Sequence, residues 1–190
     1  TDTTWTADNP YDLATQIFVR NGATLTIEPG NVIASTPTAN GSGALAVTRD
    51  SQIFAEGTCE NPIIFTSTAD VATWDADASH PTGGDPTTGT WREAANEWGN
   101  LTIMGNGYIS KTSNPPFPAT NTKTCDGGNF SPMEGLVPQV PDDPNTIYGG
   151  DDDDDNSGVL KYVNFRYGGR VVGLANELNG LSLGGIGRGT

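Results

Sequence analysis

The chain has little positive charge: only 9 of its 190 residues are lysine or arginine, against 23 aspartates and glutamates, and its formal net charge is −14. A protein that binds nucleic acid or docks on anionic lipid needs a basic face, so this composition argues against both classes. Long apolar runs are also missing, since none approaches the roughly 18 residues of a membrane-spanning helix. We therefore expect no nucleic-acid partner and no membrane insertion.

Long helices are equally unexpected, because the chain holds 25 glycines and 13 prolines, which disfavour helix interiors. Disorder is unexpected too, because 34% of the residues are hydrophobic and four are tryptophan. The length suits a single domain over residues 1–190. Abundant threonine, asparagine, aspartate and glycine with little lysine is typical of a secreted bacterial surface protein, and we expect an extracellular location.

Cysteine is scarce, with only Cys59 and Cys125 in the chain. In an extracellular protein these two residues could form one disulfide, whereas in the cytosol they would stay reduced. We favour the disulfide, which would stabilise the fold by roughly 4 kcal/mol in the chain-entropy model. The alternative is two unpaired thiols.

Short runs of alternating side chains recur along the chain, each ended by glycine, asparagine or proline. In residues 23–28 (ATLTIE), for example, Leu25 and Ile27 would face inward while the threonines face outward. Only residues 94–98 and 174–178 could make a helical turn. The pattern therefore predicts an all-β chain with strands at residues 16–20, 23–28, 32–34, 44–48, 52–55, 62–67, 100–104, 108–110, 159–166, 171–172 and 180–183.

The strands are very short and turn at glycine or asparagine, and their outward positions carry threonine and asparagine rather than a second apolar face. A sandwich or barrel is possible, but these features favour a parallel β-solenoid, in which each coil stacks on the last. Two long segments, at about residues 70–97 and 111–147, exceed ordinary turns and are predicted to be insertions into the coil.

A family resemblance supports the solenoid. Residues 22–33 (GATLTIEPGNVI), 44–49 (ALAVTR), 53–57 (IFAEG) and 61–67 (NPIIFTS) look like the opening coils of secreted bacterial right-handed parallel β-helix proteins. Residues 156–162 (NSGVLKY) and 176–190 (NELNGLSLGGIGRGT) continue the likeness. The resemblance implies a pectate-lyase-like right-handed β-helix on a surface or secreted protein, and it is specific for architecture rather than for chemistry.

An acidic run is the most conspicuous local motif. Five neighbouring carboxylates repel one another, and an oxygen-coordinated cation such as Ca²⁺ would relieve that repulsion. The alternative is a solvated acidic loop, since the EF-hand spacing is absent. Asp75, Asp77 and Asp85 are a weaker second candidate. We predict a Ca²⁺ site at Asp151, Asp152, Asp153, Asp154, Asp155 and Asn156.

Catalysis is not expected from this sequence. His80, the single histidine, lies in a glycine- and proline-rich insertion without a recognisable partner, and neither cysteine has a histidine nearby. A lyase needs a cation and a basic group, and Arg166, Arg170 and Arg188 are the available arginines near the acidic run. We predict that the chain is not an enzyme, with polysaccharide lyase activity as the less favoured reading.

The terminal coils suggest a structural role. A solenoid presents open strand edges at its ends, and no capping helix is recognisable here. Either the chain is a fragment of a longer protein, or head-to-tail contacts between copies propagate an extracellular filament stabilised by Ca²⁺. We favour the filament, and predict its contact residues to be Trp5, Ile17 and Val19 at one end and Leu181, Leu183 and Ile186 at the other.

A carbohydrate-binding or adhesive domain of a larger surface protein is the competing prediction. Trp5, Trp74, Trp91 and Trp98 could form a platform for surface glycans, or they could pack inside the coil and its insertions. An exposed tryptophan in a groove would favour sugar binding, whereas inward tryptophans and flat apolar ends would favour assembly.

Overall fold

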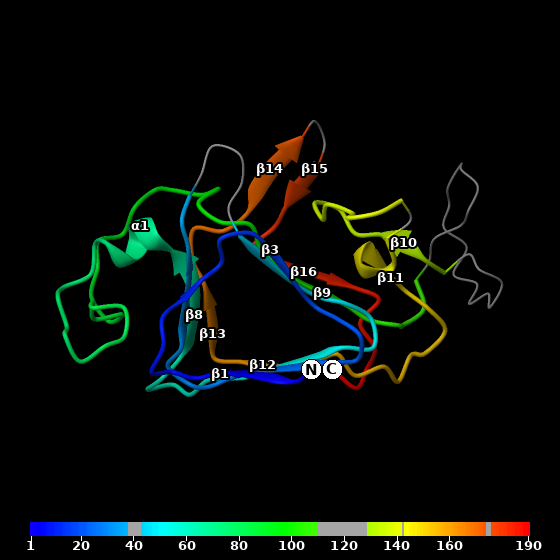
Figure 1. Cartoon of the computed structure of the whole chain (residues 1–190), viewed down its shortest axis with the longest axis horizontal. Helices are drawn as coiled ribbons and strands as arrows, with labels where there is room; N and C mark the ends of the chain where they lie inside the picture. Colours follow the sequence, from blue (N-terminus) through cyan, green and yellow to red (C-terminus); the bar gives the residue numbers. More distant parts are fainter. Residues whose placement is uncertain (38–42, 110–128, 142, 174–175) are drawn as a thin grey trace.

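A computed structural model describes residues 1–37, 43–109, 129–141, 143–173 and 176–190, with the backbone alone for residues 172, 173, 176 and 177. Its main strands form three four-stranded parallel sheets, which make three sides of a coil (Figure 1). Sheet one contains β1 (Thr3–Trp5), β4 (Thr24–Ile27), β7 (Gln52–Glu56) and β12 (Gly158–Lys161). Sheet two contains β2 (Tyr11–Asp12), β5 (Val32–Ser35), β8 (Ile63–Ser67) and β13 (Val163–Phe165). Sheet three contains β3 (Gln16–Val19), β6 (Ala44–Val47), β9 (Leu101–Met104) and β16 (Leu181–Gly184).

Successive strands thus pass from sheet one to sheet two to sheet three, and each such turn is one rung of the coil. Four rungs are stacked, and every pairing within the three sheets is parallel. The predicted parallel β-helix is therefore confirmed.

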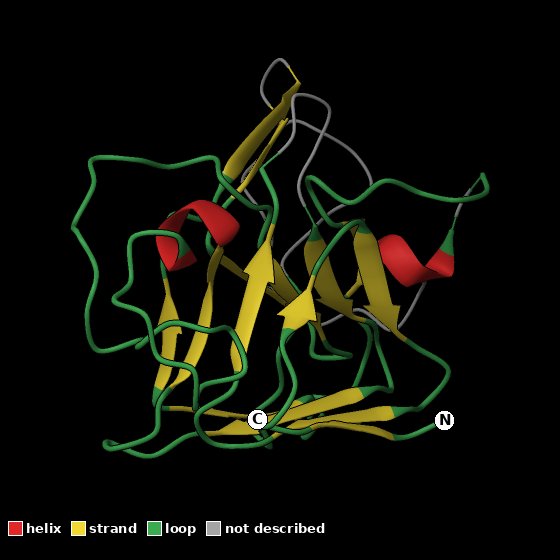
Figure 2. Cartoon of the chain, turned by 60° about the vertical axis from the view of Figure 1, so that its left-hand side comes forward, coloured by secondary structure: helices red, strands yellow, loops and turns green. Residues whose placement is uncertain are grey.

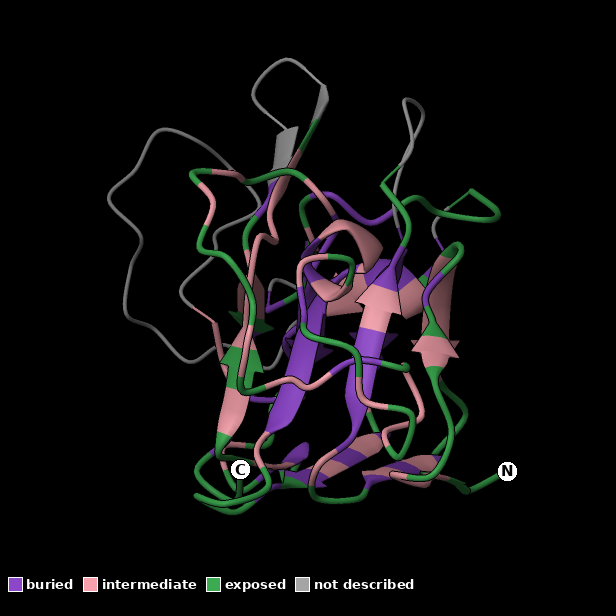
Figure 3. Ribbon diagram, turned by 90° about the vertical axis from the view of Figure 1, so that its left-hand side faces the viewer, coloured by how far each residue is buried: buried purple, intermediate pink, exposed green. Residues whose placement is uncertain are grey.

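Inward side chains stack into ladders from rung to rung. In sheet three one ladder joins Ile17, Leu45, Leu101 and Leu181. The members in the two middle rungs are fully buried, whereas the outer two are only partly covered. Figure 3 shows the same gradient in sheet two, where buried β5 and β8 lie between half-buried β2 and β13. The core therefore lies along the axis of the coil and is densest in its middle.

An aromatic cluster occupies the corner where sheet two meets sheet three. Trp98 is fully buried, and its ring stacks with Phe65 and Phe165 at centroid separations of 5.8 and 6.4 Å. The indole Nε1 donates a hydrogen bond of 2.7 Å to the backbone carbonyl of Arg166. Trp98 therefore links rung three to rung four through both packing and a satisfied buried N–H.

Several local predictions were wrong. The run at residues 159–166 divides into β12 and β13 at Tyr162, whose φ of 49° turns the chain through a corner. Residues 94–98, a possible helical turn, form no helix. Of the other possible turn, residues 174 and 175 lie outside the described part of the chain, and the rest forms β15 (Asn176–Leu178). Residues 108 and 109 are not in a strand, and residue 110 lies outside the described part of the chain.

The remaining elements decorate the coil. β14 (Arg170–Gly173) pairs antiparallel with β15 in a hairpin that projects from the coil, as Figure 2 shows. Helix α1 (Thr68–Val71) follows β8 directly. The second insertion holds β10 (Ser131–Pro132), η1 (Pro144–Thr146) and β11 (Ile147–Tyr148). Within the described residues, no helix has the length and apolar character needed to span a bilayer.

Candidate functional site

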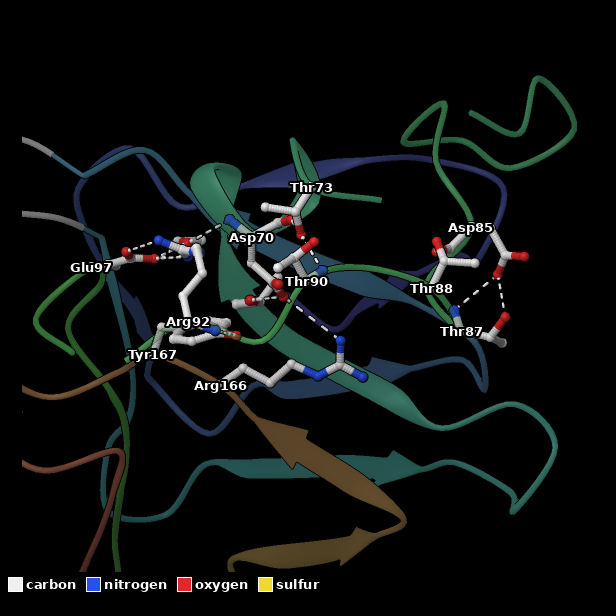
Figure 4. Close-up of polar contacts among 12 residues, drawn as sticks. Asp70, Thr73, Asp85, Thr87, Thr88, Thr90, Arg92, Glu97, Arg166 and Tyr167 are labelled. Carbon is white, nitrogen blue, oxygen red and sulfur yellow. Dashed lines mark hydrogen bonds and ion pairs between the residues drawn. The ribbon is translucent and has the colours of Figure 1, made fainter. Parts of the chain in front are cut away.

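A groove of about 570 Å³ opens beside α1, between the coil and the first insertion. We call it the Asp70 groove; its lining consists of Asp70, residues 88–94, Arg166 and Tyr167. Three parts of the chain meet here: the end of sheet two, the first insertion, and the segment after β13 (Figure 4). The groove therefore depends on the coil for one wall and on the insertion for the other.

Asp70 lines this groove but is buried, with only 3% of its surface exposed. Its backbone N–H donates to Ser67 Oγ, which caps α1, and Thr66 Oγ1 donates to Asp70 Oδ2 at 2.7 Å. Arg166 Nη1 lies 3.6 Å from the same oxygen. Within the described part of the chain, no hydrogen bond reaches Oδ1. The carboxylate is thus rigidly placed but has acceptor capacity left.

Arg92 and Glu97 fasten the insertion to the coil. Arg92 donates two hydrogen bonds to the Glu97 carboxylate, of 2.6 and 2.7 Å, and its guanidinium lies 4.6 Å from the centre of the Tyr167 ring. Ser67 Oγ also donates to Glu97. The hydrogen bonds from Arg92, followed by that from Ser67, hold the pKa of the Glu97 carboxyl below its usual value, and Glu97 raises the pKa of Arg92. The pair therefore stays charged and joined at neutral pH.

Trp91 stands out because the residue is 79% exposed although its neighbours on both sides are held by hydrogen bonds. Thr90 N–H donates to Thr73 Oγ1 at 3.2 Å, and Arg92 is held by Glu97. Of the four tryptophans considered as a platform, Trp74 and Trp98 are buried and Trp5 is half-buried. The burial of Trp74 and Trp98 contradicts a platform shared by the four tryptophans, and Trp91 is the exposed member and lines the Asp70 groove.

Asp70 was not predicted as a site residue. Its local signal is the three-residue spacing from Ser67, which matches a helix cap and carries no hint of a ligand. Arg166 was considered as a possible basic group of a lyase beside the acidic run, but it lies against Asp70 instead.

The side chains of the acidic run reach different partners. Asp155 is the buried member: its Oδ1 accepts from Asn106 Nδ2 at 3.1 Å and its Oδ2 from Ser157 Oγ at 2.9 Å. Asp154 forms an ion pair with Arg188, and Asp154 raises the pKa of that guanidinium. Much of the run therefore binds other parts of the chain.

The remaining members also serve local structure. Asp152 Oδ1 accepts from the N–H of Asp154, and Asn156 Oδ1 accepts from the N–H of Gly158. Asp153 Oδ1 accepts from the N–H of Tyr108 at 3.2 Å, and Asp151 is exposed. In the described ranges no three histidine, cysteine, aspartate or glutamate side chains gather into a metal-binding group. Ca²⁺ binding stays a prediction.

The weaker acidic candidate consists of two turn-forming aspartates and Asp75. Asp77 accepts from the N–H and hydroxyl of Ser79, and Asp85 does the same with Thr87. These hydrogen bonds lower the pKa of both carboxyls. Cys59 is exposed, and its predicted disulfide partner Cys125 lies outside the described residues.

A family model described as a pectate-lyase-like beta helix domain matches residues 1–77 and 86–190. The chain belongs to this family. The unmatched residues of this pectate-lyase-like β-helix, 78–85, lie within the first insertion. Neither the comparison with curated proteins nor that with solved structures found a match.

The two end rungs of this pectate-lyase-like β-helix contain the predicted assembly residues. Trp5, Ile17 and Val19 are half-buried and line a cavity of about 350 Å³ at the first rung. In the fourth rung Leu181 and Ile186 are half-buried and Leu183 is 57% exposed. Leu183 pairs in register with the buried Ile103. Within the described residues, Leu183 is the last member of this side-chain ladder, and no further rung covers it.

Proposed function

We propose that this β-helix domain binds carbohydrate through the Asp70 groove, as an extracellular adhesive or glycan-binding module without a catalytic step. The observation that carries the proposal is that Trp91, which is 79% exposed, lines a groove that also contains the buried carboxylate of Asp70 and Arg166. Ligand sites combine apolar or aromatic surface with a few fixed polar groups. A sugar ring offers the matching surfaces, an apolar C–H face and hydroxyl edges.

The groove also supports this proposal through its rigidity. The hydrogen bonds of Thr90 to Thr73 and of Arg92 to Glu97 restrain the backbone on both sides of Trp91. A loop whose backbone is held in advance loses less conformational entropy when a ligand binds, so more of the contact energy appears as affinity. An exposed aromatic ring at a restrained position is the arrangement that binding requires.

Replacement of Trp91 tests the proposal. We expect Trp91→Ala to weaken binding to the saccharides captured by the wild-type domain on a glycan array by at least about tenfold, equivalent to 1.4 kcal/mol. Titration calorimetry with those saccharides measures the change. Trp91→Phe should restore part of the affinity, because it restores an aromatic face.

Tyr162→Ala is the matched control, because Tyr162 is another exposed aromatic residue, 54% accessible, at the corner between β12 and β13. This variant should bind as the wild type does. Equal affinities for Trp91→Ala and Tyr162→Ala would contradict carbohydrate binding in the Asp70 groove.

Head-to-tail assembly into a Ca²⁺-stabilised extracellular filament is the second candidate function. The open ladder at Leu183 favours it, because Val19 begins the same ladder at the other end, in strands of the same direction. A C-terminal rung of one copy placed on the N-terminal rung of another would continue the ladder as a heterologous contact.

We expect negative-stain electron microscopy of the domain in Ca²⁺ to show fibres that shorten in EDTA, and Leu183→Asp to abolish them. The matched control is Val171→Asp, because Val171 is 61% exposed on the projecting hairpin and belongs to no coil ladder. Compact single particles for the wild type in both solutions would contradict assembly between copies. Fibres that are unchanged by EDTA would contradict the role of Ca²⁺ alone.

A further inference from the structure

We propose that the Asp70 groove selects neutral saccharides and discriminates against uronates. In this proposal Asp70 and Arg166 form hydrogen bonds with two adjacent hydroxyls of the sugar ring. This inference rests on the carbohydrate binding proposed above and adds the chemical class of the ligand. It follows from how the charges in the groove are paired, which donors and acceptors remain open, and how firmly those groups are held.

The positive charges of the groove are already neutralised by the chain itself. Arg92 is engaged by both oxygens of Glu97, and Arg166 lies 3.6 Å from Asp70 Oδ2. Glu93, on the lining, is exposed, and no cation pairs with it among the described residues. A uronate carboxylate would therefore meet no unpaired cation and would approach a domain whose net charge is −14.

Asp70 and Arg166 supply the acceptor and the donor on which this proposal depends. Asp70 Oδ1 receives no hydrogen bond from the described residues, so it can accept from a ligand hydroxyl. Arg166 makes one loose contact with Asp70, and its guanidinium lies 6.0 Å from the centre of the Trp74 ring. The remaining N–H groups of Arg166 can donate to a second hydroxyl, because an arginine carries five donors.

These two groups lie beside each other, as the dashed contact between them in Figure 4 shows. Neighbouring hydroxyls on a sugar ring can therefore engage both at once, one as donor and one as acceptor. A neutral diol satisfies the pair without separating its charges. A carboxylate in the same place would compete with Asp70 for Arg166 and would face Asp70 as a like charge.

Selectivity also requires that Asp70 and Arg166 stay in place when a ligand binds. Asp70 is fixed by Thr66 and Ser67, and Arg166 follows β13, whose Phe165 pairs in register with Phe65. Because Asp70 is 3% exposed, water reaches it poorly, and a ligand that lacks the hydroxyl leaves Asp70 Oδ1 without a hydrogen bond. Sites that hydrogen-bond a ligand hydroxyl discriminate strongly against analogues without it.

The test compares two ligands that differ at one group. Oligogalacturonide and its carboxyl-reduced form have the same length and linkage and differ only in the C6 carboxylate or hydroxymethyl group. They are titrated together with neutral cello-, manno- and xylo-oligosaccharides. We expect the best neutral probe to bind at least about tenfold tighter than oligogalacturonide. Its affinity should change little between about 50 and about 500 mM salt, because a neutral ligand forms no ion pair with the groove.

Asp70→Asn supplies a readout that a purely structural role would not produce. It should weaken neutral binding and, by releasing Arg166 and removing a like charge, strengthen binding of oligogalacturonide. Arg166→Gln should weaken neutral binding without that gain. Asp85→Asn is the matched control, because Asp85 is a carboxylate of the same insertion that caps a turn and does not line the groove.

The outcomes separate the two proposals. Binding that depends on Trp91 but favours oligogalacturonide over its reduced form overturns the selection of neutral ligands and leaves carbohydrate binding intact. Binding unaffected by Trp91→Ala, or no binding of any probe, overturns both. The wild-type ligand comparison decides selectivity even where a variant at Asp70 fails to fold.

Discussion

Trp98→Ala is expected to lower the free energy of unfolding by about 4 kcal/mol, the range found when a large aromatic side chain is removed from a core. Trp98 is fully buried and stacks with Phe65 and Phe165, so alanine would leave a cavity between rungs three and four. The substitution also leaves the carbonyl of Arg166 without its 2.7 Å hydrogen bond. Urea-induced unfolding followed by circular dichroism measures the loss.

Trp91→Ala is the control for this experiment, since it removes the same side chain from a position that is 79% exposed. Its unfolding free energy should stay within about 0.5 kcal/mol of the wild type. Similar losses for the two tryptophans would mean that the aromatic cluster does not hold the rungs together.

Gly158→Ala is expected to prevent β12 from joining the coil, with a loss of more than about 3 kcal/mol. Gly158 has φ of 117°, which side chains rarely adopt, and a Cβ there would lie 1.8 Å from the carbonyl oxygen of Ile53. This carbonyl belongs to β7, the strand with which β12 pairs. Neither strand can move aside without breaking the parallel pairing, so the clash cannot be relieved locally.

Thermal unfolding of Gly158→Ala beside Gly180→Ala measures this effect. Gly180 precedes β16, and a Cβ built there meets nothing within 4 Å. The Gly180 variant should melt near the wild-type temperature, whereas the Gly158 variant should melt far below it or fail to fold. A small shift for Gly158→Ala would show that the fourth rung tolerates distortion where it begins.

The strands of the coil could be predicted because their inward residues alternate within a few positions. Leu25 and Ile27 alternate with threonines, and β4 occupies that run. The break at Tyr162 could not be predicted, because a positive φ at tyrosine has no signal in residue type. Edge strand β1 was missed since its threonines show no apolar alternation, and only pairing with β4 defines it.

The Asp70 groove could be predicted only in part. The exposed Trp91 was among the candidate sugar contacts, but nothing in the sequence distinguishes it from Trp74, which lies in the same insertion and is buried. Asp70 and Arg166 meet because Phe65 and Phe165 pair in register, and that register is a property of the stacked rungs. The acidic run was conspicuous in the sequence because its charges are contiguous, yet its side chains separate toward Asn106, Arg188 and other partners once folded.

The separations along the sequence between paired residues of sheet one indicate which insertions the fold can accept. Ile53 pairs with Leu25, 28 positions earlier, and with Gly158, 105 positions later. Loop-closure entropy grows only with the logarithm of length, so the longer connection is disfavoured by about 1.2 kcal/mol relative to the shorter one. Burial of one or two methylene groups offsets that difference. The segment between β9 and β12 could therefore be lengthened or replaced while the four-rung coil persists. Binding surfaces on this segment can thus diversify without a change in the coil that carries them.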